Sequence, residues 1–167
     1  MKVRALLGAV GIMAVLGSTA GVALAQNQTQ SNLNLYQVAG DIGTAIMTLE
    51  RDQQDYGEHR AREIGWLRKA HKELRQSEKW AASHGYGYTQ PISPAPPPYH
   101  GSGGRYVQST SNQTVVDARN HVPNWIAQLQ SDNRDYGGHR AAAIGYLQNA
   151  ETELNLAIQW FNSHGGH

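Results

Sequence analysis

The chain of 167 residues contains no cysteine. This absence excludes disulfide bonds, thiolate metal sites, covalent haem attachment of the c type and a cysteine nucleophile. The sequence also lacks the HExxH motif of zinc proteases and the Glu-x-x-His pair that two helices of a di-iron bundle contribute. Stability must therefore come from packing, and two common forms of metal catalysis have no motif here.

Long apolar runs are confined to the first 25 residues. Lys2 and Arg4 precede an apolar segment over 5–16, and small residues follow up to Ala25, which is the layout of a cleavable secretory signal. The apolar segment is too short to span a membrane. We therefore expect a mature chain that begins at Gln26, has no membrane span and is periplasmic or secreted.

The mature chain has no excess of positive charge. Without Lys2 and Arg4 it holds 12 Lys and Arg against 13 Asp and Glu, a formal charge of −1. A nucleic-acid-binding domain normally carries a basic patch, so a nucleic-acid partner is not expected.

One segment of the chain occurs twice, at a constant offset of 80 residues. Between Asp52–Gly85 and Asp132–Gly165, 17 of 34 positions are identical, which indicates internal duplication. Both copies contain an Asp-Tyr-Gly-x-His-Arg stretch, and both end in Ser-His-Gly.

Residues 86–113 separate the copies and are rich in proline, glycine, serine and threonine. Such a segment buries too little apolar surface to fold alone, so we predict a disordered linker. Its tyrosines, beginning with Tyr86, either hold it against the surface or offer a partner site. The predicted organisation is a signal peptide (1–25), a first repeat (26–85), the linker (86–113) and a second repeat (114–167).

Apolar residues recur at helical spacing on both sides of each repeated turn. In the first repeat they predict a helix over 32–54 and a second helix that ends near Gly85, because glycine accepts the positive φ of a helix cap. In the second repeat, Pro123 predicts that the first helix begins near Val122 or is kinked there. The predicted core stripes are Leu35, Val38, Ala39, Ile42, Ala45, Ile46, Leu49, Ala61, Ile64, Leu67, Ala70, Leu74 and Ala81, and, in the second repeat, Val115, Val116, Val122, Trp125, Ile126, Leu129, Ala143, Ile144, Leu147, Ala150, Leu154, Ala157, Ile158 and Phe161.

A single helical hairpin cannot cover its own apolar stripe, whereas two hairpins can share one core. We therefore predict an all-α fold in which two tandem helical hairpins pack as an antiparallel four-helix bundle. An up-down-up-down order would place both turns at one end and both Ser-His-Gly segments at the other, so that duplicated histidines become neighbours.

The residues of the turn have a purely structural interpretation. Asp55 can accept hydrogen bonds from free N–H groups at the start of the next helix, and Tyr56 can cover the end of the core. Gly57 permits a tight bend, His59 hydrogen-bonds across the turn, and Arg60 forms a surface ion pair with an aspartate. The same roles apply 80 positions later.

A second interpretation is a divalent metal site with zinc, nickel or copper(II), for which imidazole and carboxylate are suitable ligands. The two turns would then form one pseudo-twofold cluster, and the two Ser-His-Gly ends would gather further histidines. The candidate ligands are His59, His139, Asp55 and Asp135 at the turns, and His84 and His164 at the helix ends.

Two further repeated pairs favour packing roles. Trp80 and Trp160 lie near helix ends, where an indole closes the core while its N–H reaches a polar partner. Gly65 and Gly145 fall inside predicted helices at a cost of about 1 kcal/mol each relative to alanine, which predicts that another helix or the tyrosine turn approaches closely there.

The turn Tyr136-Gly137-Gly138-His139-Arg140, followed by Ala-Ile, a spaced Leu and Ala, and Glu-Leu, resembles that of small exported bacterial proteins without an assigned activity. This likeness covers both hairpins and not the linker. The chain is also similar to small periplasmic metal-binding proteins, which are His-rich four-helix bundles. That resemblance implies binding of several divalent metals through histidines on helix faces, although only two histidine pairs recur here.

No catalytic constellation converges in the sequence, because the repeated aspartates stand beside arginines and no nucleophile has an adjacent base. We expect an exported helical bundle that serves as a structural or interaction module, without catalytic activity and with an unidentified protein partner. The alternative is low-affinity binding of zinc, copper or nickel. A third reading is a haem bundle, in which Met47 pairs with a histidine as axial ligand.

Overall fold

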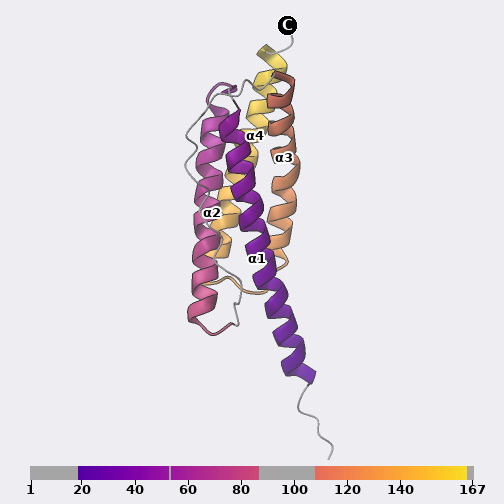
Figure 1. The fold of residues 1–167 in the computed structure, drawn as a ribbon, viewed down its shortest axis with the longest axis vertical. Helices are drawn as coiled ribbons and strands as arrows, with labels where there is room; N and C mark the ends of the chain where they lie inside the picture. The colour runs from indigo at the N-terminus through magenta and orange to yellow at the C-terminus, as the bar shows by residue number, and fades with distance from the viewer. Residues whose placement is uncertain (1–18, 53, 87–107, 165–167) are drawn as a thin grey trace, which may run out of the picture.

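The structure, a computed structural model, describes residues 19–52, 54–86 and 108–164. These residues form four α-helices and no strand, namely α1 (Thr19–Arg51), α2 (His59–Ser83), α3 (Gln108–Gln130) and α4 (His139–His164). The helices pack side by side, with the N-terminal turns of α1 projecting beyond the other three (Figure 1), so the all-α prediction is confirmed. None of the helices, over the described ranges, is long and apolar enough to cross a membrane.

Two predicted segments fall largely outside these ranges. Helix α1 begins at Thr19, within the predicted signal peptide, of which residues 1–18 are not described. Most of the predicted linker, residues 87–107, also lies outside the described chain. Tyr86 does lie within it, and its ring stacks on Trp80 with 5.4 Å between centroids. This tyrosine therefore holds its end of the segment against the bundle.

The second hairpin is inverted relative to the first. Helices α1 and α4 run toward the end of the molecule where the C-terminus lies, whereas α2 and α3 run away from it (Figure 1). The expected up-down-up-down order is therefore wrong, and the two turns lie at opposite ends. The inversion places Tyr56 against Trp160 and Tyr136 against Trp80, so each turn covers the end of the other hairpin.

Each helix touches two others. Helix α2 packs most extensively on α4, α1 packs on α2 and α3, and α3 packs on α4. The stacked rings of Trp66 and Tyr146, 5.9 Å apart, join equivalent positions of the two copies, so they mark the pseudo-twofold axis. All four helices thus contribute to one shared core.

Most residues of the predicted core stripes are buried. Ala61 and Val116 are exposed, and Ala45, Ile64, Ile144, Ile158 and Phe161 are half-buried. On α2 the inward position after Ala61 is taken by Glu63, which stands where the second copy has the buried Ala143. The fully buried apolar side chains include Leu35, Val38, Ile42, Ile46, Leu49, Leu67, Leu74, Val122, Leu129, Leu147 and Leu154.

Helix α3 continues through Pro123, so the prediction that it begins near Val122 is wrong. Val115 and Ala118 before the proline are buried, and so is Trp125 after it. Burial of this continuous face offsets the cost of an interior proline, about 3 kcal/mol. The pyrrolidine ring itself is exposed to solvent.

The end of α2 has the predicted glycine cap. Gly85 adopts φ +73°, and the N–H of Tyr86 donates to the carbonyl of Ala81 at 3.1 Å, the bond of a Schellman motif. The equivalent Gly165 lies outside the described residues.

Close approach at Gly65 and Gly145 is not observed. A Cβ atom added at either position would meet nothing within 4 Å outside its own helix. The prediction of a tight helix contact there is therefore wrong. The adjacent aromatic rings of Trp66 and Tyr146 keep the two backbones apart at this point.

Candidate functional site

Each turn docks on the second helix of the other hairpin, and we call these two regions the end contacts. Helices α2 and α4 position their residues, because the two helices lie side by side and run in opposite directions. The first end contact comprises Tyr56, Gly57, His59, Glu153 and Trp160, and the second comprises Tyr136, Gly137, His139, Glu73 and Trp80.

A histidine–carboxylate pair lies in each end contact. His59 Nδ1 is 2.8 Å from Glu153 Oε2, and His139 Nδ1 is 2.8 Å from Glu73 Oε2. The first pair is the more enclosed, with side chains 18% and 15% exposed against 34% and 22% in the second. Both glutamates occupy identical positions of the repeat, yet their role was not predicted. Their identity in both copies was the signal that could have revealed it.

An aromatic pair closes each end of the core. Tyr56 meets Trp160 edge to face with centroids 6.3 Å apart, and Tyr136 meets Trp80 in the same way at 6.1 Å. Both tyrosines are 1% exposed, which confirms that they cover the core's ends. Edge-to-face geometry is the preferred arrangement of two aromatic rings.

The turn glycines are required for two reasons. Gly57 and Gly137 have φ +67° and +70°, a region that other residues rarely adopt. A Cβ atom at Gly57 would also lie 2.7 Å from Trp160 Cδ1, and one at Gly137 would lie 2.8 Å from Trp80 Nε1. The glycines therefore permit both the bend and the docking of the tryptophan.

The tyrosine hydroxyls extend the duplication beyond the 34-residue segment. Tyr56 donates to Asn112 Oδ1 at 3.1 Å, and Tyr136 donates to Asn32 Oδ1 at 3.4 Å. The two asparagines are themselves 80 positions apart. Tyr136 also hydrogen-bonds to Ser31. The start of each hairpin is thus fixed to the turn of the other hairpin by an equivalent polar contact.

Both arginines bind backbone carbonyls, and Arg140 also forms the expected ion pair with the turn aspartate, since its Nε lies 4.0 Å from Asp135 Oδ1. Arg60 Nη1 donates to the carbonyl of Leu49 at 2.9 Å and to that of Asp52. Arg140 repeats both bonds at 2.7 Å with Leu129 and Asp132. Cations at a helix C-terminus satisfy its free carbonyls and oppose the helix dipole. Each arginine therefore caps the preceding helix.

The capping role predicted for the turn aspartates is observed in the second copy. Asp135 Oδ1 accepts a hydrogen bond from the N–H of Ala141 at 3.1 Å, in the first turn of α4. Asp55 is exposed, and its backbone carbonyl accepts a bond from the N–H of Arg60 at 3.3 Å.

The candidate metal ligands at the turns are not brought together. His59 lies beside Glu153 while His139 lies beside Glu73, and His59 and Glu73 are 14 residues apart on α2. That separation is about 21 Å at 1.5 Å per residue. Two imidazoles on one metal ion must lie within about 2 Å of it, so these two cannot share an ion.

The histidines at the helix ends are also apart, each on its own tryptophan. His84 stacks on Trp80 with centroids 4.0 Å apart, and His164 stacks on Trp160 at 4.8 Å. Within the described ranges, no three His, Asp or Glu residues are grouped so that they could hold a metal ion.

Helix α2 carries three buried ionisable side chains that the sequence did not reveal, namely Glu63, His71 and Glu78. Neither oxygen of the Glu63 carboxyl has a hydrogen-bond partner among the described residues, and burial raises its pKa well above the usual range. Burial, together with the charges of Arg75 and Arg68, lowers the pKa of His71 to about 4. The burial of Glu63 could have been inferred from the alignment of the copies, in which it stands opposite to Ala143.

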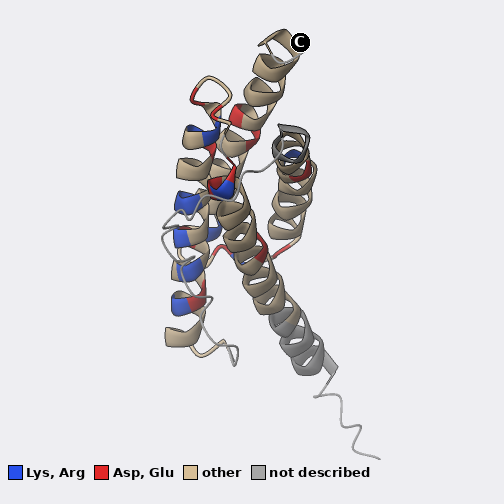
Figure 2. Cartoon of the chain, turned by 45° about the horizontal axis from the view of Figure 1, so that its top comes forward, with Lys and Arg blue, Asp and Glu red and all other residues tan. Residues whose placement is uncertain are grey.

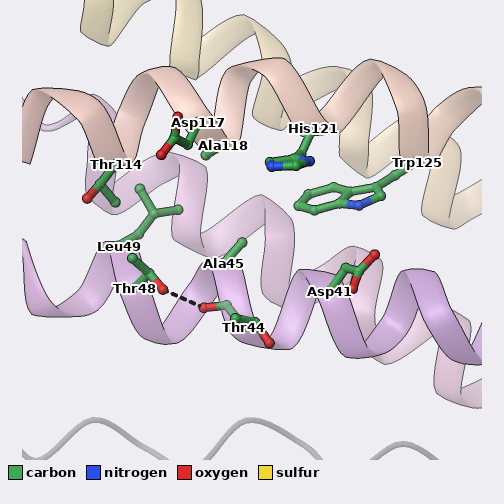
Figure 3. A pocket seen from close by; sticks show the side chains of 10 residues that line it. All are labelled: Asp41, Thr44, Ala45, Thr48, Leu49, Thr114, Asp117, Ala118, His121 and Trp125. Atoms are coloured by element: carbon green, nitrogen blue, oxygen red, sulfur yellow. Dashed lines mark hydrogen bonds between the residues drawn. The ribbon is translucent and has the colours of Figure 1, made fainter.

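A groove of about 360 Å³ lies between α1 and α3 (Figure 3). Its floor is apolar and its rim holds hydroxyl, imidazole and carboxylate groups. His121 stacks parallel to Trp125 at 5.9 Å, above one end of the groove. The lining residues are Asp41, Thr44, Ala45, Thr48, Leu49, Thr114, Asp117, Ala118, His121 and Trp125.

The groove lies where the two copies differ. Ala45 stands opposite to Trp125 in the alignment of the copies, and Ala118 is aligned with Val38. Ala45 and Ala118 both line the groove, and their small side chains leave this space between the helices. Asp41 and His121 also occupy equivalent positions, which shows that the rim chemistry has diverged too.

The charges near the groove are negative. Lysine and arginine gather on α2, as Figure 2 shows, whereas α1 and α3 hold only Arg51 and Arg119 over their described lengths. Arg119 donates to Asn155 of α4 at 3.4 Å. Neither Asp41 nor Asp117 forms an ion pair with a cation of the described residues. The groove therefore offers two carboxylates without a balancing positive charge.

No protein-family model, no curated protein and no solved structure matches this chain.

Proposed function

We propose that the protein is an exported, non-catalytic binding module, built as an antiparallel four-helix bundle whose recognition surface is the groove between α1 and α3. The observation that carries this proposal is a contrast between the residues of the end contacts and those of the groove. The duplicated polar residues of the end contacts bond to one another, as in the pair His59–Glu153. The groove, in contrast, is lined by residues that differ between the copies, with Leu49 as the exception.

Differences between duplicated halves favour a role in recognition. A scaffold that needs only stability is served by the same side chains in both copies, as at the end contacts. A cavity lined by apolar groups with a few convergent polar groups is the usual form of a ligand site. Asp41, Asp117 and His121 supply those polar groups, and Leu49 and Ala118 supply the apolar surface.

The binding role can be tested by NMR titration of the purified protein. Ligand panels of organic cations, organic anions and neutral aromatics would be added, and the indole N–H of Trp125 would be followed with the amides of α1 and α3. We expect at least one class to shift these signals in wild type and not in Ala45→Trp, which fills the groove. Signals that stay unmoved with every class would refute the groove as a recognition surface.

Export is proposed from residues 1–25 and has its own test. Expression of the full chain in a bacterium with a periplasm should yield a fractionated protein whose N-terminal residue is Gln26. Retention of Met1 in the purified protein, with the protein in the cytoplasm, would contradict this part of the proposal.

Low-affinity metal binding is the second candidate function. Each end contact supplies one imidazole and one carboxylate, for example His59 and Glu153, and such groups are ligands for zinc, copper(II) or nickel. Calorimetry of the metal-stripped protein with each ion, repeated on His59→Ala/His139→Ala, tests it. Heat that is saturable in wild type and lost in the double variant supports this function, and silence in wild type removes it.

A further inference from the structure

We infer that the groove between α1 and α3 binds a linear aliphatic polyamine, with one ammonium group at Asp41 and another at Asp117. This inference rests on the proposed function, because it names the ligand class of the same groove. It is carried by the placement of the two carboxylates, by the apolar floor between them and by the shortage of cations on both helices.

The carboxylates stand toward the two ends of the groove. Figure 3 shows Asp41 on α1 facing the end where Trp125 lies, and Asp117 on α3 toward Thr114 at the other end. Asp117 and Trp125 are eight residues apart on α3, which corresponds to about 12 Å along the helix. One ion cannot bridge such a span, but an extended dication can.

The surface between the carboxylates suits methylene groups. Ala45, Leu49 and Ala118 form the floor, and burial of a methylene against such a surface stabilises by about 0.8 kcal/mol. The hydroxyls of Thr44 and Thr48 stand along the α1 side of the groove. Both donate to carbonyls of their own helix, at 3.1 and 2.9 Å, so each hydroxyl oxygen presents lone pairs to an ammonium group.

The aromatic end also favours a cation. The Trp125 indole and the His121 ring lie parallel above Asp41 (Figure 3), and an ammonium group near an indole face is attracted by the ring quadrupole. Asp117 is oriented at the other end by Gln113, whose Nε2 donates to Asp117 Oδ1 at 2.7 Å. A metal ion fits less well, because within the described part of the chain no three ligating side chains converge.

The spacing predicts which polyamine fits. An extended chain advances about 1.2 Å per bond, since the three bonds of an extended residue span about 3.6 Å. Nine bonds separate the terminal nitrogens of spermidine, or about 11 Å, whereas the five bonds of putrescine give about 6 Å by the same geometry. Spermidine is therefore long enough to reach from Asp117 to the Trp125 end of the groove, about 12 Å along α3, whereas putrescine covers about half of that length.

Calorimetry of the purified full chain with spermidine, putrescine and sodium acetate as probes tests the inference. We expect saturable one-to-one binding of spermidine, about tenfold tighter than putrescine, and no binding of acetate. Asp41→Asn and Asp117→Asn should each weaken spermidine binding by about three- to fivefold, and raised salt should weaken it further. Both aspartates are exposed, so neither variant should disturb the fold.

Two controls separate groove binding from general attraction to an acidic surface. Ala45→Trp should abolish binding while circular dichroism stays unchanged, and Glu58→Gln, which removes an exposed carboxylate outside the groove, should leave the affinity of wild type. No spermidine binding, or equal losses in Glu58→Gln and Asp41→Asn, would overturn the inference. If spermidine does not bind while another ligand class shifts the Trp125 indole signal, the polyamine inference is contradicted and the proposed binding function is supported.

Discussion

The Nδ1 atom of His59 lies 2.8 Å from Oε2 of Glu153, and this contact joins the turn of the first hairpin to the last helix of the second. The reciprocal contact between His139 and Glu73 has the same length at the other end of the bundle. Together with the tyrosine–tryptophan pairs, these contacts determine how the hairpins dock.

The two histidine–glutamate pairs should differ in strength. A double-mutant cycle on His59→Ala and Glu153→Ala should give a coupling free energy of about 1 kcal/mol, because the pair is mostly enclosed. The cycle on His139→Ala and Glu73→Ala should give less, since water screens the more exposed pair. Urea unfolding at pH 6 provides the measurement. Two couplings of zero would show that neither pair holds the hairpins together.

Alanine in the turn should destabilise the protein much more than alanine in the helix. Gly57→Ala combines a left-handed backbone with a clash against Trp160, so we expect a loss of about 2–4 kcal/mol in the free energy of unfolding. Gly65→Ala is the matched control in open space, where alanine should stabilise by about 0.5–1 kcal/mol. Equal midpoints for the two variants in urea unfolding would contradict the docking of the tryptophan on the turn.

Removing the buried carboxyl of Glu63 on α2 should stabilise the protein at neutral pH. The raised pKa of Glu63 means that the folded state holds its proton more tightly than the unfolded state, so stability falls as pH rises from about 4.5 through the folded pKa. Glu63→Ala, which copies Ala143, should therefore raise the free energy of unfolding at pH 7 by about 1 kcal/mol or more.

The pH dependence provides the check on this variant. The stabilisation should shrink at pH 4, where the wild-type carboxyl is protonated in both states. The reverse change Ala143→Glu should destabilise at pH 7, because Ala143 is fully buried. A lower thermal midpoint for Glu63→Ala than for wild type at pH 7 would show that the carboxyl has a stabilising partner.

His71 should make the fold sensitive to mild acid. Its folded pKa of about 4 lies below the usual histidine value of 6.5, so its contribution to stability is complete above pH 6.5 and is lost as pH falls toward 4. The loss is on the order of 2–3 kcal/mol. Glu63 has the opposite dependence, so urea midpoints at pH 7, 5.5 and 4 should be compared between Glu63→Ala and Glu63→Ala/His71→Gln. Parallel slopes in the two proteins would show that His71 does not cause the acid sensitivity.

Local features of the fold could be predicted because they depend on neighbours in sequence. Helical spacing placed Leu35, Leu67 and Leu147 in the core, and the preference of glycine for positive φ placed the cap at Gly85. The prediction of a helix start near Pro123 was wrong, because burial of both halves of α3 outweighs the local cost of proline.

The docking of the hairpins could not be predicted, because the same apolar stripes can pair in either sense and a long segment between Tyr86 and Gln108 can reach either end. The metal interpretation placed His59 and His139 together because it assumed the wrong docking sense. The groove was missed because it arises from differences such as Ala45 against Trp125, whereas comparison of the copies drew attention to identities.

Each hairpin docks its turn on the other hairpin, and this reciprocal arrangement indicates how such a chain could arise. A polypeptide with one hairpin would find every surface that it lacks on a second identical molecule, since Tyr136 and Trp80 repeat what Tyr56 and Trp160 do under a twofold rotation. Joining the two in tandem makes their association independent of protein concentration. It also frees each half to acquire its own substitutions, which a symmetric dimer of one gene product cannot do.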